Sequence, residues 1–358
     1  MQVTVYCRRQ YYDQRPAEYH GVRCVYLPAP GGKSFESIVS SNLSIGHAAF
    51  LSRHDLAFVV DPGNGPFLLP LMLRGTPRVL HTDGLGWQRT KWSDLQRRYY
   101  KWSERVSAAC STWLVTDSRV MRQYYLDEYG APSSFIPYGH VTGEAGQPSD
   151  LGGFDVEPGG YLLAVARMEP ENNLDLVIRE YQKTRCALPL LVVGGSRYES
   201  AYARETMALA DARVRCLGNV FEPRQLNALY AHSRLYIHGH QVGGTNPGLL
   251  RAMGAGAACL AIDVPFHREV LGEEPPYFSK EPGNLAGLIE TLTGDATRLA
   301  SMAQQAKQRA RESYRWDAVA AAYAELFERL LASVAGGARF APPADYEPYR
   351  PAEYRDRP

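Results

Sequence analysis

Short runs of β-branched and aliphatic residues alternate with longer amphipathic segments along most of this chain. The strand-like runs are residues 2–7, 23–27, 56–60, 78–82, 113–116, 161–166, 190–193, 214–217, 235–238 and 258–262. The helix-like segments are residues 94–109, 119–129, 174–183, 201–210, 223–231, 247–254, 285–292 and 296–311. This alternation predicts parallel sheets with helices on both faces. The fold class is therefore α/β.

One segment of different composition divides the chain. Residues 141–160 carry Gly, Pro, Ser and acidic residues without an apolar period, which is typical of an interdomain linker. We therefore expect one Rossmann-like domain over residues 1–140 and a second over residues 161–315. Residues 316–334 have helical apolar spacing and should pack on one of the sheets. Residues 335–358 are rich in Pro, Tyr, Arg and Asp, which predicts a flexible tail.

Composition excludes several classes of protein. The chain has 358 residues, 45% of them hydrophobic, which is enough to build two domains. A net charge of +1 argues against a nucleic-acid partner, because such proteins are strongly basic. The chain has no long apolar run, no signal-peptide pattern at its start and no cysteine pair at metal-ligand spacing. We expect a cytoplasmic protein with reduced cysteines.

The beginning of the first domain is unusual. A doubly wound domain normally opens with a strand, a Gly-rich turn and a helix, and that turn faces the ligand. Here residues 2–7 already form a strand, and no such turn precedes them. Either the domain is a small variant or its first β-α unit is missing. We favour the second interpretation, and with it an N-terminal half that folds poorly.

Three loops that follow strands in the second half could bind an anion. Arg167 stands before a helix start, and a guanidinium there suits a diphosphate. Asn172 or its neighbour Asn173 could instead cap the next helix. The other two loops are weaker signals, because any tight turn can use the same residue types. They contain Gly194 and Gly195, and Asn219.

The strongest signal is a fourth loop, residues 243–247. It reads Gly243, Gly244, Thr245, Asn246 and Pro247, and it leads into a helix. Consecutive glycines present free N–H groups, and proline suits the first helical turn, so the loop predicts an anion cradle at a positive helix end. It is not a P-loop, because the Gly-Lys-Ser/Thr ending is missing.

The first half has one polar loop after a strand. Asp83, Trp87 and Arg89 lie in it, and the mixture of a carboxylate, donors and an indole suggests a sugar-acceptor surface. Core packing is the alternative for Trp87. Residues 97–102 place basic and aromatic side chains on one helix, which predicts either a peripheral membrane contact or an ordinary solvated face. No Asp-x-Asp pair is present, so we expect no metal and no cofactor.

These residues resemble bacterial GT-B retaining glycosyltransferases, in particular the capsule and surface-polysaccharide rhamnosyltransferases. The resemblance extends from Met1 to about Leu331, and several segments carry it together. They are residues 3–9 (VTVYCRR), 83–89 (DGLGWQR), 136–139 (IPYG), 167–173 (RMEPENN) and 243–247 (GGTNP).

The resemblance implies two Rossmann-like domains that face each other across a cleft. The second half would bind the nucleotide-sugar donor, with Arg167 at the phosphates and residues 243–246 at the diphosphate and sugar. The first half would bind a glycolipid or saccharide acceptor, with Asp83 near the reacting centre. Transfer with retention is thought to proceed by front-face attack assisted by the leaving phosphate. No protein nucleophile is then required.

Three departures from the family pattern concern the site. Relatives carry a Gly-rich β-α unit before the segment that begins here at Gln2. Where relatives place a ribose-binding Glu, this chain has Arg251, and a cation cannot accept bonds from ribose hydroxyls. A deoxyribose donor loses less by this change, which favours dTDP-rhamnose. Asn172 replaces a phosphate-binding cation, as in the rhamnosyl-type relatives, and Gly86 replaces a Glu.

Two classes of function remain open at this point. The first is an enzyme that transfers rhamnose from dTDP-rhamnose to a glycolipid or polysaccharide precursor. The second is a truncated or catalytically impaired relative that binds a nucleotide sugar or acts as a scaffold. Arg167 and residues 243–246 favour the enzyme, whereas Arg251 and the unusual start favour the second class. A GT-B epimerase is a weaker alternative, because no carboxylate constellation for it is found.

Overall fold

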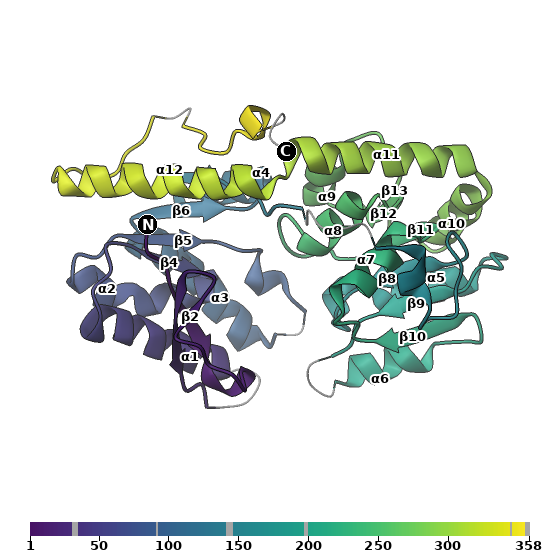
Figure 1. Cartoon of the computed structure of the whole chain (residues 1–358), viewed down its shortest axis with the longest axis horizontal. Coiled ribbons are helices and arrows are strands. Elements are labelled where there is room, and N and C mark those ends of the chain that lie inside the picture. Colours follow the sequence, from purple (N-terminus) through teal and green to yellow (C-terminus); the bar gives the residue numbers. More distant parts are fainter. Residues whose placement is uncertain (31–34, 91, 141–145, 197–199, 344–345, 355–358) are drawn as a thin grey trace.

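A computed structural model describes residues 1–30, 35–90, 92–140, 146–196, 200–343 and 346–354 of the chain. Two α/β lobes lie side by side in it, and a long C-terminal helix runs over the first lobe (Figure 1). The linker expected over residues 141–160 falls between the lobes. Its described part packs on the second lobe, where Leu151 is 2% exposed within a hydrophobic cluster.

The strands of the first lobe form two separate sheets. The larger sheet is parallel and has the order β4 (Ala57–Val60), β5 (Arg78–His81), β6 (Trp113–Thr116) and β7 (Ser133–Phe135). In the smaller sheet, β3 (Val22–Leu27) pairs in parallel with β1 (Thr4–Arg8) and antiparallel with β2 (Glu18–Tyr19). Among the described residues no strand joins β1 to β4, so each keeps an unpaired edge.

Helices cover both faces of the larger sheet. Those of the first lobe are α1 (Phe35–Gly46), α2 (Leu69–Leu73), α3 (Asp94–Cys110) and α4 (Arg119–Tyr129). Leu80 and Leu114 point to one face and pack with a cluster that includes α2 and α4 residues. Val79 and Val115 point to the other face, where they meet α12 (Trp316–Ala335). The last helix of the chain therefore completes the core of the first lobe, as its apolar spacing predicted for one of the sheets.

The second lobe contains one parallel sheet of six strands. Its order is β10 (Val214–Gly218), β9 (Leu190–Val193), β8 (Leu162–Val165), β11 (Leu235–His238), β12 (Cys259–Ile262) and β13 (Tyr277–Phe278). The chain builds outward from β8 to β10 and then returns to place β11 on the other side of β8. The direction of winding thus reverses between β8 and β11, and ligands bind at such a point in doubly wound sheets, beyond the carboxyl ends of the strands.

Seven helices surround this sheet in the described residues. They are α5 (Leu174–Gln182), α6 (Ala201–Ala208), α7 (Pro223–Ala231), α8 (Pro247–Ala255), α9 (Pro265–Leu271), α10 (Asn284–Gly294) and α11 (Ala296–Ser313). Two clusters of buried aliphatic and aromatic side chains, one on each face, anchor them to the strands. None of the described helices is long and apolar enough to cross a bilayer.

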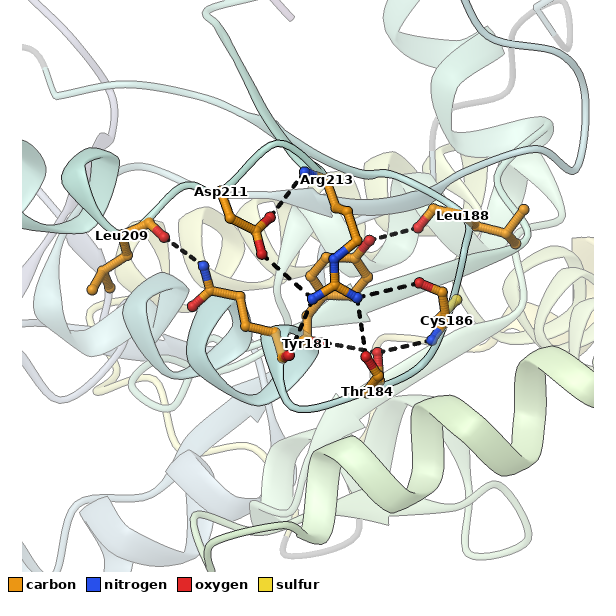
Figure 2. A network of polar contacts seen from close by, with 8 residues as sticks. Tyr181, Thr184, Cys186, Leu188, Leu209, Asp211 and Arg213 are labelled. Atoms are coloured by element: carbon orange, nitrogen blue, oxygen red, sulfur yellow. Dashed lines mark hydrogen bonds and ion pairs between the residues drawn. The ribbon is translucent and has the colours of Figure 1, made fainter.

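A polar network stabilises the amino ends of β9 and β10, opposite the carboxyl ends of the strands (Figure 2). The Arg213 guanidinium donates to the carbonyl oxygens of Gln182 and Thr184, each at 3.0 Å. It also lies 5.0 Å from the centre of the Tyr181 ring, whose hydroxyl donates to Leu188 O. These contacts stabilise the turn between α5 and β9, at the end of the sheet away from the carboxyl ends of its strands.

The segment after α12 differs from the flexible tail that its composition predicts. Phe340, Tyr346 and Tyr349 are 6%, 8% and 5% exposed, and they belong to the cluster between α12 and the first sheet. The prediction is wrong here because it weighed proline and charge above three aromatic side chains, which bury large apolar areas. Residues 344–345 and 355–358 lie outside the described part.

The tail therefore contributes to stability. Phe340 packs edge-on against Trp113, with ring centres 5.0 Å apart. We expect Phe340→Ala to lower the free energy of unfolding by about 3–5 kcal/mol, the usual cost of emptying a buried aromatic site. The matched control is Arg339→Ala, because Arg339 is exposed. Guanidinium denaturation would measure both, and equal stability of the two variants would contradict the packing role.

Candidate functional site

The loop after β8 places Arg167 at the reversal point of the second sheet. Arg167 is exposed. Its main-chain carbonyl oxygen accepts a hydrogen bond from Asn172 Nδ2 at 2.8 Å. Asn173 donates from Nδ2 to Gly239 O, at 2.7 Å, and ties this loop to the one after β11. Asn173 is the N-cap residue of α5, as the capping alternative allowed, but it makes no side-chain bond to the helix and its backbone is left-handed. Both shape the loop that presents the guanidinium.

The glycines after β9 allow close packing of two loops. Gly194 has a φ of +124°, and a side chain there would overlap the carbonyl oxygen of Ala166. A Cβ on Gly195 would lie 3.3 Å from Asn219 Nδ2, so Asn219 stands directly beside this turn. Gly194, Gly195 and Asn219 are therefore close together, as expected for loops that follow neighbouring parallel strands.

The loop of residues 243–246, here called the donor loop, follows β11 and leads into α8. Gly243 has a φ of +148°, which favours glycine. The Asn246 side chain accepts hydrogen bonds from the N–H groups of Gly248 and Leu249, at 2.9 and 3.4 Å. Asn246 thus caps α8, and Gly244 and Thr245 are buried, so Gly243 is the member of the four expected residues that is neither buried nor a helix cap.

Arg251 lies on α8 but is held by α7. Its Nε donates to Asn227 Oδ1 at 2.8 Å, and a terminal nitrogen donates to Pro223 O at 3.2 Å. Its guanidinium is half-buried, and some of its N–H groups already donate hydrogen bonds within the protein. A ligand hydroxyl would find donors here and no carboxylate acceptor from this residue.

The polar loop of the first lobe lies after β5. Asp83 has a left-handed backbone, with a φ of +51°, and its Oδ2 lies 3.4 Å from a terminal nitrogen of Arg89. The Asp83 side chain is 37% exposed and remains accessible. Trp87 is different, because its indole N–H donates to the Tyr124 hydroxyl at 3.2 Å and the Lys101 ammonium lies 5.1 Å from its ring. Trp87 therefore packs against α3 and α4.

Gly86 has a steric reason for being glycine in this chain. A Cβ placed on it would lie 2.6 Å from the ring of Tyr100, which lies on α3. Trp92, just before that helix, stacks on the same ring. The space beside Gly86 is thus filled by an aromatic side chain. A Glu at this position would require Tyr100 to move.

The two lobes touch through the donor loop. A Cβ on Gly84 would overlap the backbone of Gly243, and a Cβ on Gly244 would overlap the Asp117 carboxylate. The Thr245 hydroxyl donates to the Asp117 carbonyl oxygen. Asp83, next to Gly84, is therefore brought beside the donor loop although the two are far apart in sequence.

Three histidine rings lie together at the carboxyl end of β11 and on α9. His238 stacks on His240 with ring centres 4.3 Å apart, and His267 lies 4.8 Å from His238. Burial lowers the pKa of His240 to about 3 and that of His267 to about 4, and nearby Arg167 acts in the same direction on His240. The three rings are consequently neutral near pH 7 and leave Arg167 as the local cation.

Sequence reasoning missed Asp61, Asp117 and His240, which also belong to this region. Asp61 and Asp117 follow β4 and β6 directly, on either side of Asp83 after β5. Burial raises the pKa of Asp61 and, more strongly, that of Asp117. Each of the three missed residues lies within two positions of a strand end, so the rule that found Arg167 and Asp83 could have found them too. In the described residues no three His, Cys, Asp or Glu side chains are grouped to hold a metal ion.

Comparisons with known proteins agree with this geometry. Residues 1–139 match the glycosyl transferase 4-like domain, and residues 159–295 match the glycosyl transferases group 1. Together these matches span most of the chain. The chain belongs to the GT-B glycosyltransferases. No curated protein sequence matches it.

Solved GT-B structures share the fold at low sequence identity. Sucrose-phosphate synthase from Thermosynechococcus elongatus is similar with a TM-score of 0.76 and 16% identity, over 92% of this chain and 89% of that chain. Anabaena HepE in complex with UDP and glucose has a TM-score of 0.72 and 15% identity, over 86% and 87%. The UDP-forming trehalose-phosphate synthase from Burkholderia vietnamiensis has a TM-score of 0.64 and 13% identity, over 85% and 81%.

The contact between Gly84 and Gly243 should control how closely the lobes of this glycosyltransferase approach. We expect Gly84→Ala to push the lobes apart, because its Cβ meets backbone atoms that cannot rotate away. Small-angle X-ray scattering would then give a larger radius of gyration than the wild type. Gly46→Ala is the control, since Gly46 is helical and a Cβ there meets nothing within 4 Å. Identical scattering from a folded Gly84→Ala protein would contradict the contact.

Proposed function

We propose that this chain transfers a sugar, rhamnose from dTDP-rhamnose, to a glycolipid or polysaccharide-precursor acceptor, with retention and without a metal ion. The observation that carries the proposal is the contact of the donor loop with the Asp83 loop. This contact brings the donor loop, at the reversal point of the second lobe's sheet, beside the accessible carboxylate of Asp83, which follows β5 of the first lobe. A donor and an acceptor would meet there.

The donor side suits a nucleotide diphosphate. Arg167 is exposed at the reversal point, and Gly243 is only partly buried and has no side chain to keep a phosphate from the backbone. Charge-assisted hydrogen bonds from a guanidinium and from backbone N–H groups are strong ligands for phosphate oxygens. Structures of Anabaena HepE with UDP and with UDP-glucose support a nucleotide-sugar donor for this chain.

The choice of donor rests on Arg251. Its guanidinium is held by Asn227 and Pro223, and it offers no acceptor to ribose hydroxyls. A deoxyribose nucleotide forgoes one of those bonds anyway, which is why we favour a dTDP-sugar. The rhamnosyl identity comes from the sequence resemblance.

The mechanism needs little from the protein beyond placement and charge. In our proposal Arg167 stabilises the negative charge that develops on the leaving diphosphate. The phosphate oxygen takes the proton of the acceptor hydroxyl on the same face, so the configuration is retained. Asp83, beside Arg89, would hold acceptor hydroxyl groups near that point.

We propose that the acceptor is lipid-linked and that the protein binds peripherally at the inner face of the cytoplasmic membrane. Exposed apolar side chains on the first lobe support this location. Phe50, Leu51 and Leu73 are 70%, 77% and 77% exposed, and Trp102 on α3 is 53% exposed beside basic residues. Such side chains favour an anionic bilayer surface.

A nucleotide-sugar-binding protein without turnover is the second candidate. The observation in its favour is that Tyr100 fills the space beside Gly86, while Arg251 replaces a carboxylate. Binding of a donor without release of free nucleotide, with every offered acceptor, would favour this candidate over the enzyme.

Arg167→Ala tests the donor assignment. We expect it to abolish measurable donor binding by calorimetry, because hydrogen bonds to charged groups contribute about 1.5–3 kcal/mol each. The fold should be unchanged, since the side chain is exposed. Arg179→Ala on α5, also exposed, serves as the control. Wild-type affinity in Arg167→Ala would show that the phosphates bind elsewhere.

Transfer should also survive removal of divalent metal. Arg167 and the backbone N–H groups of the donor loop would neutralise the diphosphate, and the sequence has no Asp-x-Asp pair to bind a bridging ion. We expect nucleotide release in EDTA to equal that in buffer with added magnesium. Loss of turnover in EDTA that manganese or magnesium restores would refute this assignment.

A further inference from the structure

Asp117 is the point of the first lobe on which the donor loop rests. It follows β6 directly and is 1% exposed. The Thr245 hydroxyl donates to its carbonyl oxygen, and Gly244 lies so close to its carboxyl group that any side chain there would overlap it. Two consecutive residues of the second lobe therefore contact Asp117. Gly244 lies against the side chain of Asp117, and Thr245 binds its main-chain carbonyl.

The Asp117 carboxyl group is poorly solvated in this position. Its Oδ1 is buried and has no hydrogen-bond partner among the described residues. An ionised carboxylate without partners is costly to bury, whereas a protonated one loses far less solvation. Burial first, and then the negative charges of Asp83 and Glu269, raise the pKa of Asp117 to about 8. The group thus holds its proton near pH 7.

The surrounding ionisable groups come from four elements. Asp83 lies in the loop after β5 and Glu269 on α9, and both favour the protonated form of Asp117. Tyr138, after β7, and Tyr323, on α12, also face Asp117, and burial keeps both neutral near pH 7. The backbone of Thr245 acts in the opposite direction and favours the ionised form.

We propose that Asp117 is a positioning residue that, as a neutral carboxylic acid, seats Gly244 and Thr245 on the first lobe and holds the two lobes together. Ionisation of the acid would separate them. The value of this device rests on the proposed function, because a neutral acid beside the donor loop does not repel a diphosphate. The same contact keeps Asp83 beside the loop.

A second contact between the lobes lies next to the first. Glu269 accepts hydrogen bonds from the N–H of Arg119, at 2.9 and 3.0 Å, and so binds the start of α4. These bonds favour the ionised form of Glu269, although burial raises its pKa. Burial outweighs these bonds, so the titration of Glu269 weakens joining as pH rises, in the same direction as that of Asp117.

The direction of the pH dependence follows from these states. When the lobes separate, Asp117 becomes exposed and its pKa returns toward the ordinary 3.8. The joined state therefore holds a proton that the separated state releases between about pH 4 and pH 8. Joining is favoured at low pH and weakens as pH rises through this window, by up to about tenfold in its equilibrium constant per pH unit. Above the pKa of the joined state, no further change from this group is expected.

The test measures the distance between the lobes without any ligand. Spin labels, introduced as noncanonical amino acids at the exposed Arg98 on α3 and Arg204 on α6, would report it by double electron–electron resonance. In the wild type we expect the joined population to fall between pH 6 and pH 8. In Asp117→Asn, which keeps the shape of the side chain but cannot ionise, it should fall much less over the same range.

Two results would overturn the proposal: a wild-type distance that does not depend on pH, or the same dependence in Asp117→Asn. If Asp117→Asn does not fold, Asp83→Asn replaces it. Removal of the Asp83 charge lowers the pKa of Asp117 in the joined state, so joining should weaken less as pH rises, and an unchanged pH dependence would count against the proposal. Because no donor is present, failure to find sugar transfer would leave this result unaffected.

Discussion

The arrangement of this glycosyltransferase depends on a contact between backbones at the donor loop. Gly243 meets Gly84, and Gly244 meets Asp117, with no room for a Cβ at Gly84 or Gly244. Such close approach brings residues from two separately folded sheets within reach of one ligand. Loops are suited to this because the strands behind them hold their ends, and glycine allows the remaining backbone to come near. In our proposal Arg167 and Asp83 become parts of one site through this contact.

Charge in the site is arranged by burial as much as by sequence. The histidines at the end of β11 and on α9 are buried and neutral, which in our proposal leaves the positive charge of Arg167 for an anionic ligand. On the other side, carboxyl groups follow three adjacent strands, and burial together with mutual repulsion keeps Asp117 protonated. Asp83 remains more exposed and is paired with Arg89. Two carboxyl groups at neighbouring strand ends thereby differ in exposure and in their partners.

The C-terminal segment shows how the two lobes depend on each other in a single chain. α12 leaves the second lobe and covers the first sheet, and Phe340, Tyr346 and Tyr349 extend that cluster. Each of the two sheets of the first lobe has two free edges in the described residues, at β1 and β2 and at β4 and β7, and apolar side chains on these strands are exposed, including Val5 and Phe58. Cover from the far end of the chain therefore matters more to this lobe than to the second, whose six strands form one continuous sheet.

The sequence by itself determined the α/β class, the division into two lobes and most strands and helices, because hydrophobic period is a local property. It did not reveal α1, α2, α9 or the short strands β2, β7 and β13, whose apolar patterns are brief or ambiguous. It also predicted roles for Arg167, Asp83 and the glycines of the donor loop from their places after strands, and those roles stay predictions. Only the tertiary structure decided that Asn246 is a helix cap, that Trp87 packs against α3 and α4, and that Asp117 lies beneath Gly244. Those roles depend on which distant segments meet, and burial sets them after the fold has formed.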